Sequence, residues 1–226
     1  MTKFKSKDTK IKLIGFDFDS TLISYPNATY SWELISKLLG SEKERKAMYK
    51  AYHDGKFSYL TWAQRSVDMF KRYGLTKSKF EELFYEQIKL MPGVDNLFYE
   101  LKLKGIKTAI ISGGIKNVYD IFLEKFGINV DYVNMAHKLN FDRKGKLVGG
   151  SISEMDYGGK VIVLQNISKK LNISLKECAF VGDERNDIPI FKKVGLPIAI
   201  NTKNPEVKAA ARVVINNDIS KILIYI

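Results

Sequence analysis

The sequence predicts an α/β fold in which a doubly wound parallel sheet carries a small inserted α-helical cap. Three observations predict it. Short apolar runs rich in β-branched residues recur along the chain, and each has the length of a strand. The segments between the later runs have the period of amphipathic helices, so strand and helix alternate as they do in a parallel sheet. About ninety residues separate the first run from the second, which is too many for one crossover helix, so an insertion lies between them.

The four expected strands occupy 11–16, 107–111, 177–181 and 196–200. The helices expected to cover the sheet occupy 94–104, 116–126, 160–171 and 187–194. A further stretch at 139–149 has strand-like flanks around an Asp-Arg-Lys-Gly sequence at 142–145, and this composition predicts a hairpin.

The insertion is expected to be helical. Its apolar spacing predicts four helices, at 30–39, 42–52, 58–73 and 77–90. Glycines separate them at Gly40, Gly55 and Gly74, and a Met-Pro-Gly sequence at 91–93 ends the last one. We therefore divide the chain into an α/β core formed by 1–22 and 91–226 and a helical cap formed by 23–90.

The composition is that of a folded globular protein. Of the 226 residues, 45% are hydrophobic and 27% are charged, which excludes a disordered chain. No apolar run is long enough to span a membrane, and the first ten residues lack the apolar run of a signal peptide. We therefore expect a cytoplasmic protein without a membrane partner. The only cysteine is Cys178 and there are two histidines, so any bound metal is expected to have oxygen ligands.

The net charge of +12 could indicate a nucleic-acid partner. However, only six of the 37 basic residues are arginines, the residue type that bidentate phosphate and base contacts favour. The lysines are scattered and are dense only over 3–12, where a solvated terminus explains them. We expect no specific nucleic-acid partner.

Two carboxylates follow the first expected strand. Asp17 and Asp19 lie two positions apart, at the carboxyl end of a parallel strand, where open α/β sheets place their ligands. One carboxylate of such a pair can act as a nucleophile or metal ligand while the other carries a proton. A turn with a helix cap gives the same pattern.

Two further segments could hold a phosphate. Ser112 and Gly113 follow the second expected strand, where a hydroxyl and unhindered backbone N–H groups suit a phosphate oxygen. Lys160 follows two glycines at an expected helix start and could neutralise phosphate charge. Taken alone, the first segment is more typical of a loop connection than of a phosphate site, and a single lysine is more typically solvated.

A second acidic pair follows the third expected strand. Asp183 and Asp187 lie four residues apart, so both can face one crevice if a helix begins between them. With phosphate and water, their oxygens form the ligand set that Mg²⁺ prefers. Two surface acids that cap a helix would look the same in isolation, but the four features occur together and in order.

In combination these residues resemble the four motifs of the haloacid-dehalogenase-like (HAD) phosphatases. The motifs are DFDST at 17–21, SGG at 112–114, Lys160 and GDERND at 182–187. The helical insertion after the first motif is similar to that of the phosphoserine-phosphatase-like branch. The resemblance implies a Rossmann-like core and a Mg²⁺-dependent phosphomonoester hydrolase. Its substrate would be a small phosphorylated metabolite, with phosphoserine among the candidates.

The resemblance also implies a role for each site residue. Asp17 would attack phosphorus to form an aspartyl-phosphate, and Asp19 would protonate the leaving oxygen and later activate water. Ser112, Gly113 and Lys160 would bind the phosphoryl group. Mg²⁺ would be held by Asp17, the backbone carbonyl of Asp19 and Asp183, with Asp187 and Asn186 in support.

The sequence departs from the serine-specific pattern at one place. Phosphoserine phosphatases carry an acid shortly after the first motif, which pairs with the substrate's amino group, whereas 23–32 contains no carboxylate and the first one is Glu33. The cap is instead rich in aromatic residues: Tyr25, Tyr30, Trp32, Tyr59 and Trp62. They could form a cage for a quaternary ammonium or stack on a larger substrate, or they could be the cap's own core.

Two alternatives remain at this stage. One is another reaction on the same scaffold, such as phosphonate hydrolysis, which would need a Schiff-base lysine that the sequence does not locate. A dehalogenase is disfavoured because it needs no acid at the position of Asp19. The other alternative is a non-enzymatic basic protein that binds nucleic acid, for which four acids in one cleft would be repulsive. The sequence leaves the oligomeric state open.

Overall fold

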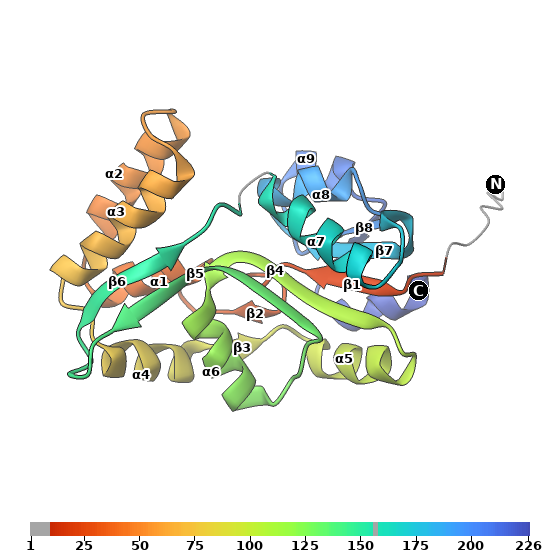
Figure 1. Ribbon diagram of the computed structural model, residues 1–226, viewed down its shortest axis with the longest axis horizontal. Helices are drawn as coiled ribbons and strands as arrows, with labels where there is room; N and C mark the ends of the chain where they lie inside the picture. Colours follow the sequence, from red (N-terminus) through yellow and green to blue (C-terminus); the bar gives the residue numbers. More distant parts are fainter. Residues whose placement is uncertain (1–9, 156–157) are drawn as a thin grey trace.

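The computed structural model describes residues 10–155 and 158–226 and has an α/β architecture, as the sequence predicts (Figure 1). Most of the lysine-dense terminus lies outside the described residues. A seven-stranded sheet has the order β6-β5-β4-β1-β7-β8-β9, and all neighbours are parallel except β5 and β6. The strands are β1 (Leu13–Phe16), β4 (Lys107–Ile115), β5 (Tyr132–Phe141), β6 (Leu147–Ile152), β7 (Cys178–Gly182), β8 (Leu196–Ile200) and β9 (Val213–Ile215).

Helices cover both faces of this sheet. On one face lie α5 (Val94–Leu103), α6 (Lys116–Phe126) and the 3₁₀ helix η3 (Ile219–Tyr225). On the other lie α7 (Gly159–Lys170), α8 (Ile188–Phe191) and α9 (Pro205–Ala210), with the short 3₁₀ turns η1 (Leu175–Glu177) and η2 (Arg185–Asp187) beside them. Because both faces are covered, β1 is buried throughout and reads as a continuous apolar run.

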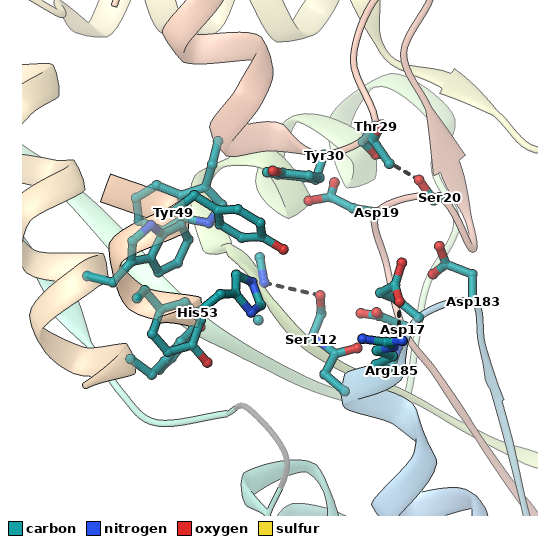
Figure 2. Close-up of a pocket in the computed structure, with 18 of the residues that line it drawn as sticks. Asp17, Asp19, Ser20, Thr29, Tyr30, Tyr49, His53, Ser112, Asp183 and Arg185 are labelled. Atoms are coloured by element: carbon teal, nitrogen blue, oxygen red, sulfur yellow. Dashed lines mark hydrogen bonds between the residues drawn. The ribbon is translucent and has the colours of Figure 1, made fainter. Parts of the chain in front are cut away.

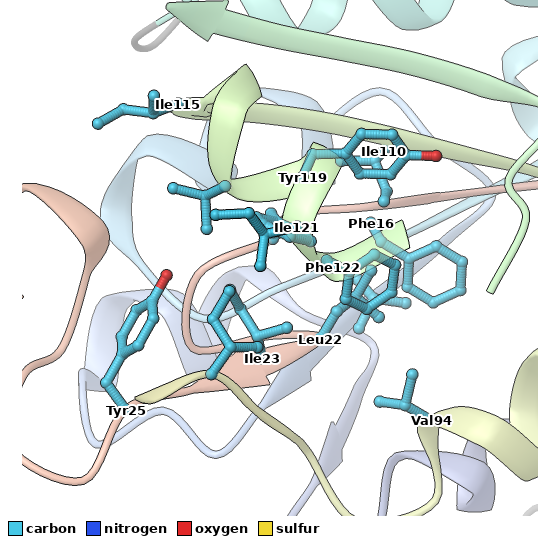
Figure 3. Close-up of a cluster of buried hydrophobic side chains, with 14 of the residues drawn as sticks. Phe16, Leu22, Ile23, Tyr25, Val94, Ile110, Ile115, Tyr119, Ile121 and Phe122 are labelled. Atoms are coloured by element: carbon cyan, nitrogen blue, oxygen red, sulfur yellow. The ribbon is translucent and has the colours of Figure 1, made fainter. Parts of the chain in front are cut away.

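Each face has its own hydrophobic core. Phe16, Phe98 and Phe122 belong to the larger core, part of which is shown in Figure 3. Phe180 and Leu164 belong to the core beneath α7. β1 alternates between the two, and these cores hold its carboxyl end in a fixed position.

The insertion contains the four predicted helices. They are α1 (Ser31–Leu38), α2 (Glu42–His53), α3 (Tyr59–Arg72) and α4 (Lys77–Gln87), and the short strands β2 (Ile23–Ser24) and β3 (Lys89–Leu90) pair antiparallel at its two ends. The side chains of Ser58 and Thr76 cap α3 and α4 by accepting from backbone N–H groups three residues on. This arrangement supports a division near residues 23 and 90, and the exact domain boundaries stay a prediction.

Three elements differ from their predicted form. The helix predicted over 77–90 ends at Gln87, because Ile88 is extended and the next two residues pair with β2. The helix predicted over 187–194 is only a 3₁₀ turn followed by one α-helical turn. Ser112 and Gly113, predicted to lie in a loop after a strand, belong to β4, which continues to Ile115 across an irregularity in its pairing with β5.

The predicted hairpin is confirmed, and it also supports the insertion. β5 and β6 pair antiparallel on either side of the turn at 142–145. The backbone N–H of Leu147 donates to the carbonyl of Leu75, and Gly150 lies against Val67 of α3. Figure 1 shows the hairpin extending from the sheet beneath α2 and α3. The core therefore supplies the surface on which the cap packs.

No helix within 10–155 and 158–226 combines the length and the apolar character that crossing a membrane requires.

Candidate active site

The site lies at the carboxyl ends of three adjacent strands. β1 pairs in parallel with β4 on one side and β7 on the other, so the residues after each strand meet at one edge of the sheet. Asp17 follows β1, Ser112 lies near the end of β4, and Asp183 follows β7. The chain leaves β1 for β4 and later returns to its other side at β7, and this reversal of strand order opens a crevice in doubly wound sheets.

Asp17 is held in place by a buried lysine. The Lys160 ammonium lies 2.9 Å from Asp17 Oδ2 and 2.6 Å from Asp187 Oδ1, and the lysine is only 1% exposed. Burial alone would lower the pKa of Lys160, but the charges of Asp17 and Asp187 raise it above its usual value. Lys160 is therefore a fixed cation beside Asp17, not one of the solvated lysines.

Asp187 stabilises the turn that carries Asp183. Its Oδ1 accepts from Lys160, and its Oδ2 accepts from the backbone N–H groups of Asp183 and Glu184 at 3.0 and 3.2 Å. Gly182 makes room for this arrangement, since a Cβ there would lie 2.2 Å from Asp187 Oδ2. Both oxygens of Asp187 are thus already engaged, which fits a supporting position.

Three carboxylates form a cluster that suits a divalent cation. Oxygens of Asp17, Asp183 and Asp187 lie within 4.8 Å of one another. Burial, together with the charges of Asp17 and Asp187, raises the pKa of Asp183 well above its usual value. Thr21 donates to Asp183 Oδ1 at 3.1 Å. All the ligand atoms offered are oxygens, which Mg²⁺ prefers. A bound Mg²⁺ would also offset the repulsion among the three carboxylates.

Asp19 is oriented by residues of the insertion. Its Oδ1 accepts from the hydroxyl of Tyr25 at 2.7 Å, and its Oδ2 accepts from the hydroxyl and the backbone N–H of Ser31 at 2.8 and 3.1 Å. Burial raises the pKa of Asp19, against the lowering effect of these hydrogen bonds. Ser31 begins α1, so the second carboxylate of the DFDST motif is tied to the N-terminus of a cap helix.

Ser112 and Gly113 line the crevice beside Asp17, on the strand that pairs with β1. Ser112 is 2% exposed, and its Oγ accepts from the backbone N–H of Gly114 at 3.1 Å. A Cβ on Gly113 would lie 3.3 Å from the hydroxyl of Tyr59 on α3, so a cap residue closely approaches this strand end. Asn186 also lines the crevice, and its side-chain oxygen is buried without a hydrogen-bond partner among the described residues.

These residues surround a cavity of about 510 Å³ between the strand ends and the insertion. Figure 2 shows Tyr49 and His53 of α2 on one side of it and Asp17 and Asp183 on the other. Seven further cavity residues come from the segment between 20 and 62: Ser20, Thr29, Tyr30, Trp32, Tyr52, Tyr59 and Trp62. The cavity thus has an acidic floor and an aromatic wall.

The structure brings all the predicted site residues to this one edge. Sequence reasoning missed Ser31, which gave no signal because nothing before the fold is known relates it to Asp19. It also missed Thr21 as a partner of Asp183, although Thr21 belongs to the DFDST motif and its position was a usable signal. Tyr25 was singled out only as a cap aromatic residue.

Comparison with known proteins places this geometry in a family. The family model of the haloacid dehalogenase-like hydrolases matches residues 11–195. The chain belongs to this family. It is 33% identical over 221 residues to a phosphoserine phosphatase of Methanocaldococcus jannaschii, covering 97% of this chain and 99% of the relative. It is 32% identical to a phosphoserine phosphatase of Campylobacter jejuni subsp. doylei, covering 85% and 88%.

Solved structures agree with this placement. A phosphoserine phosphatase structure described as a phospho-aspartyl intermediate analogue superposes with a TM-score of 0.78 at 34% identity, covering 96% of this chain and 99% of that one. A HAD family hydrolase from Salmonella enterica superposes with a TM-score of 0.82 at 26% identity, covering 98% and 73%. The protein is thus a HAD-type phosphatase with a helical insertion after its first strand. Its acidic cluster is consistent with a metal site.

Proposed function

We propose that this phosphatase is a Mg²⁺-dependent phosphomonoester hydrolase that acts on a small phosphorylated metabolite through an aspartyl-phosphate. The observation that carries the proposal is the environment of Asp17. Its carboxylate lies at the end of β1 beside the buried Lys160 ammonium, within the cluster of three acids. A carboxylate so placed can attack a phosphoryl group whose negative charge is balanced by a fixed cation.

The reaction proceeds in two displacements. An oxygen of Asp17 attacks phosphorus, the bond to the leaving oxygen breaks, and Asp19 gives its proton to that oxygen as the alcohol departs. Asp19 then takes a proton from water, which attacks the phosphorus of the aspartyl-phosphate. This second attack breaks the bond to Asp17 and releases inorganic phosphate. Ser112, Gly113 and Lys160 bind the phosphoryl oxygens throughout.

The metal site would be formed by Asp17, Asp183 and the backbone carbonyl of Asp19, with Asp187 and Asn186 in support. When bound, Mg²⁺ would supply positive charge to the phosphoryl oxygens. The side chains around it have separate tasks. Asp187 orients the Asp183 turn by accepting hydrogen bonds from two backbone N–H groups. The Lys160 ammonium lies between the carboxylates of Asp17 and Asp187 and offsets the repulsion between them.

Phosphoserine is one candidate substrate, because several relatives are named phosphoserine phosphatase. The insertion covers the cavity in which the leaving group would lie. Substrate choice is therefore expected to reside in 23–90, since the strand ends contact only the phosphoryl group that all such substrates share.

Hydrolysis of 4-nitrophenyl phosphate with Mg²⁺ tests the proposal. Asp17→Asn should lose nearly all turnover because an amide is a poor nucleophile, and the exposed Asp68→Asn control should not. Asp19→Asn should accumulate a phosphoryl adduct on Asp17, detected by mass after acid quenching, because the second displacement lacks its base. Wild-type turnover by Asp17→Asn, or an adduct on another residue, would contradict the mechanism.

A further inference from the structure

The part of the cavity wall that the insertion forms has no charged side chain suited to bind an amino acid. Among the described residues that line the cavity, those from the insertion include no carboxylate, lysine or arginine. Glu33, the first acid of the cap, instead pairs with Lys37 and accepts from the backbone N–H of Thr29. The core adds Glu184 and Arg185 to the lining, and both already have partners: Glu184 accepts from Asn204 Nδ2 at 3.3 Å, and Arg185 pairs with Glu206 at 2.7 Å. A leaving group that carries both an ammonium and a carboxylate would be desolvated against the insertion without partners there and would have to displace these pairs on the core side, which is costly.

What the insertion offers instead is a set of aromatic rings. The ring centroids of Trp32 and Trp62 lie 5.3 Å apart, and those of Tyr49 and Trp62 lie 6.1 Å apart. Tyr30, Tyr52, His53 and Tyr59 complete this wall. At about 510 Å³ the cavity is large for a serine side chain and large enough for a ring-bearing alcohol. Rings of this kind bind planar groups by stacking and edge contacts.

The two tryptophans also present unused hydrogen-bond donors. The indole Nε1 atoms of Trp32 and Trp62 are buried and have no hydrogen-bond partner among the described residues, although both residues line the cavity. Buried indole N–H groups normally find an acceptor. A ligand with an acceptor atom on its ring would supply one once the side chains that cover these two Nε1 atoms shift.

We propose that the preferred substrates are phosphomonoesters whose leaving group is an uncharged planar ring with a hydrogen-bond acceptor, rather than phosphorylated amino acids. The inference rests on the proposed function, since it assigns the leaving-group side of the same site. The aromatic wall stacks on the ring, and the indole N–H groups of Trp32 and Trp62 donate to its acceptor.

A quaternary ammonium leaving group fits this wall less well. The Arg45 guanidinium already lies 5.6 Å from the ring centroid of Tyr30, and its Nη1 donates to the Tyr30 hydroxyl. A second cation on this ring would meet that charge. A quaternary ammonium also has no acceptor for the two indoles.

Four alkyl esters with similar leaving oxygens distinguish these substrates: 3-pyridylmethyl phosphate, benzyl phosphate, phosphoserine and phosphocholine. We expect kcat/KM for benzyl phosphate to exceed that for phosphoserine and phosphocholine by about 10-fold, from ring contacts alone. The pyridyl ester, which differs from benzyl by one ring nitrogen, should gain about 3-fold or more from the indole donors.

Variants test the two parts separately. Trp62→Phe and Trp32→Phe keep a ring but remove a donor, so one or both should abolish the advantage of the pyridyl ester over the benzyl ester. Tyr49→Ala, at a residue that is 38% exposed and therefore tolerant of truncation, should lower kcat/KM for both ring esters about 3- to 10-fold more than kcat/KM for phosphoserine. Tyr73→Ala, at an exposed tyrosine outside the cavity, is the matched control.

The outcomes separate this inference from the proposed function. Hydrolysis that depends on Asp17 but prefers phosphoserine or phosphocholine by 10-fold or more overturns the inference alone. Equal kcat/KM values for the pyridyl and benzyl esters overturn the role of the indoles. If none of the esters, nor 4-nitrophenyl phosphate, is hydrolysed in an Asp17-dependent way, the proposed function fails and the inference fails with it.

Discussion

At the scale of single residues, the position of Asp19 depends on the insertion more than that of any other predicted site residue. Tyr25 and Ser31 donate three hydrogen bonds to its carboxylate; Tyr25 lies in the segment that leads into α1, and Ser31 is the first residue of α1. Both contact Asp19 and neither lines the cavity, so we assign them as positioning residues. Their effect should appear where protonation of the leaving oxygen limits the rate.

We therefore predict that Tyr25→Phe and Ser31→Ala lower kcat for an alkyl phosphate by about 10-fold or more, because proton transfer contributes about 10²- to 10⁴-fold and a misplaced acid loses part of it. The first displacement with 4-nitrophenyl phosphate, whose leaving group needs little protonation, should slow much less. Single-turnover kinetics of the first displacement on both esters measure the difference, with Tyr99→Phe as an exposed control. An equal loss on both esters would indicate a general structural defect instead.

At the scale of elements, α3 is joined to the core through a buried histidine on β5. The Tyr59 hydroxyl and His137 Nε2 lie 2.7 Å apart, and the imidazole packs edge-on against Trp32 with ring centroids 5.1 Å apart. Burial lowers the pKa of His137 to about 4. The contact therefore contains a neutral imidazole.

This contact predicts a loss of stability in acid. The unfolded chain binds a proton to His137 near the ordinary histidine pKa of 6.5, whereas the folded chain does so only near 4, so the unfolded state gains protons first. The free energy of unfolding should fall as the pH decreases from about 6.5 to about 4, by up to about 3 kcal/mol. Chemical denaturation at several pH values measures it. The His137→Gln variant should lose the part of this pH dependence that comes from His137. The His53→Gln variant, at an exposed histidine, should keep it.

The end of β7 packs so tightly against Asp187 that it leaves no room for a side chain at Gly182. A Cβ on Gly182 would lie 2.2 Å from Asp187 Oδ2 and 2.4 Å from its Cγ, and Asp187 is fully buried. We predict that Gly182→Ala displaces Asp187 and lowers kcat/KM by about 10-fold or more, since it disturbs the residue that orients Asp183. Gly149→Ala on β6, where a Cβ meets nothing within 4 Å, is the control. Unchanged kinetics for Gly182→Ala would mean that the turn adapts without cost.

At the scale of the whole molecule, the cluster of acids at the sheet edge couples metal binding to stability. We predict that Mg²⁺ raises the melting temperature, because an ion that binds only the folded chain stabilises it by mass action. Chelation should reverse the shift and abolish turnover. Asp183→Asn should remove the Mg²⁺-dependent shift while melting no lower than the wild type in chelator, since it relieves repulsion among buried carboxylates. Thermal melts with and without Mg²⁺ provide a readout independent of activity, and a shift retained in Asp183→Asn would contradict the ligand assignment.

Local sequence patterns were enough to predict the architecture and the floor of the site. Period and length of the apolar runs identify β1, β4, β7 and β8, because strands buried on both faces must be continuously apolar. The carboxyl ends of parallel strands lie at one edge of a sheet. Asp17, Ser112 and Asp183 each follow an expected strand, so their positions predicted that they lie close together. Helices within the insertion were predicted because their amphipathic spacing and glycine ends are local features.

Features that depend on distant partners became visible only in the folded chain. The helix α4 ends at Gln87 because Lys89 and Leu90 pair with β2, although the local sequence pattern of 88–90 still favours a helix. Lys160 is a site residue because the fold buries it between two carboxylates, which distinguishes it from the solvated lysines that sequence reasoning could not exclude. Ser31 reaches Asp19 across 12 positions, and the aromatic residues of the cap are at once its core and the wall of the cavity. Such contacts join segments that are far apart in the chain, so no local pattern encodes them.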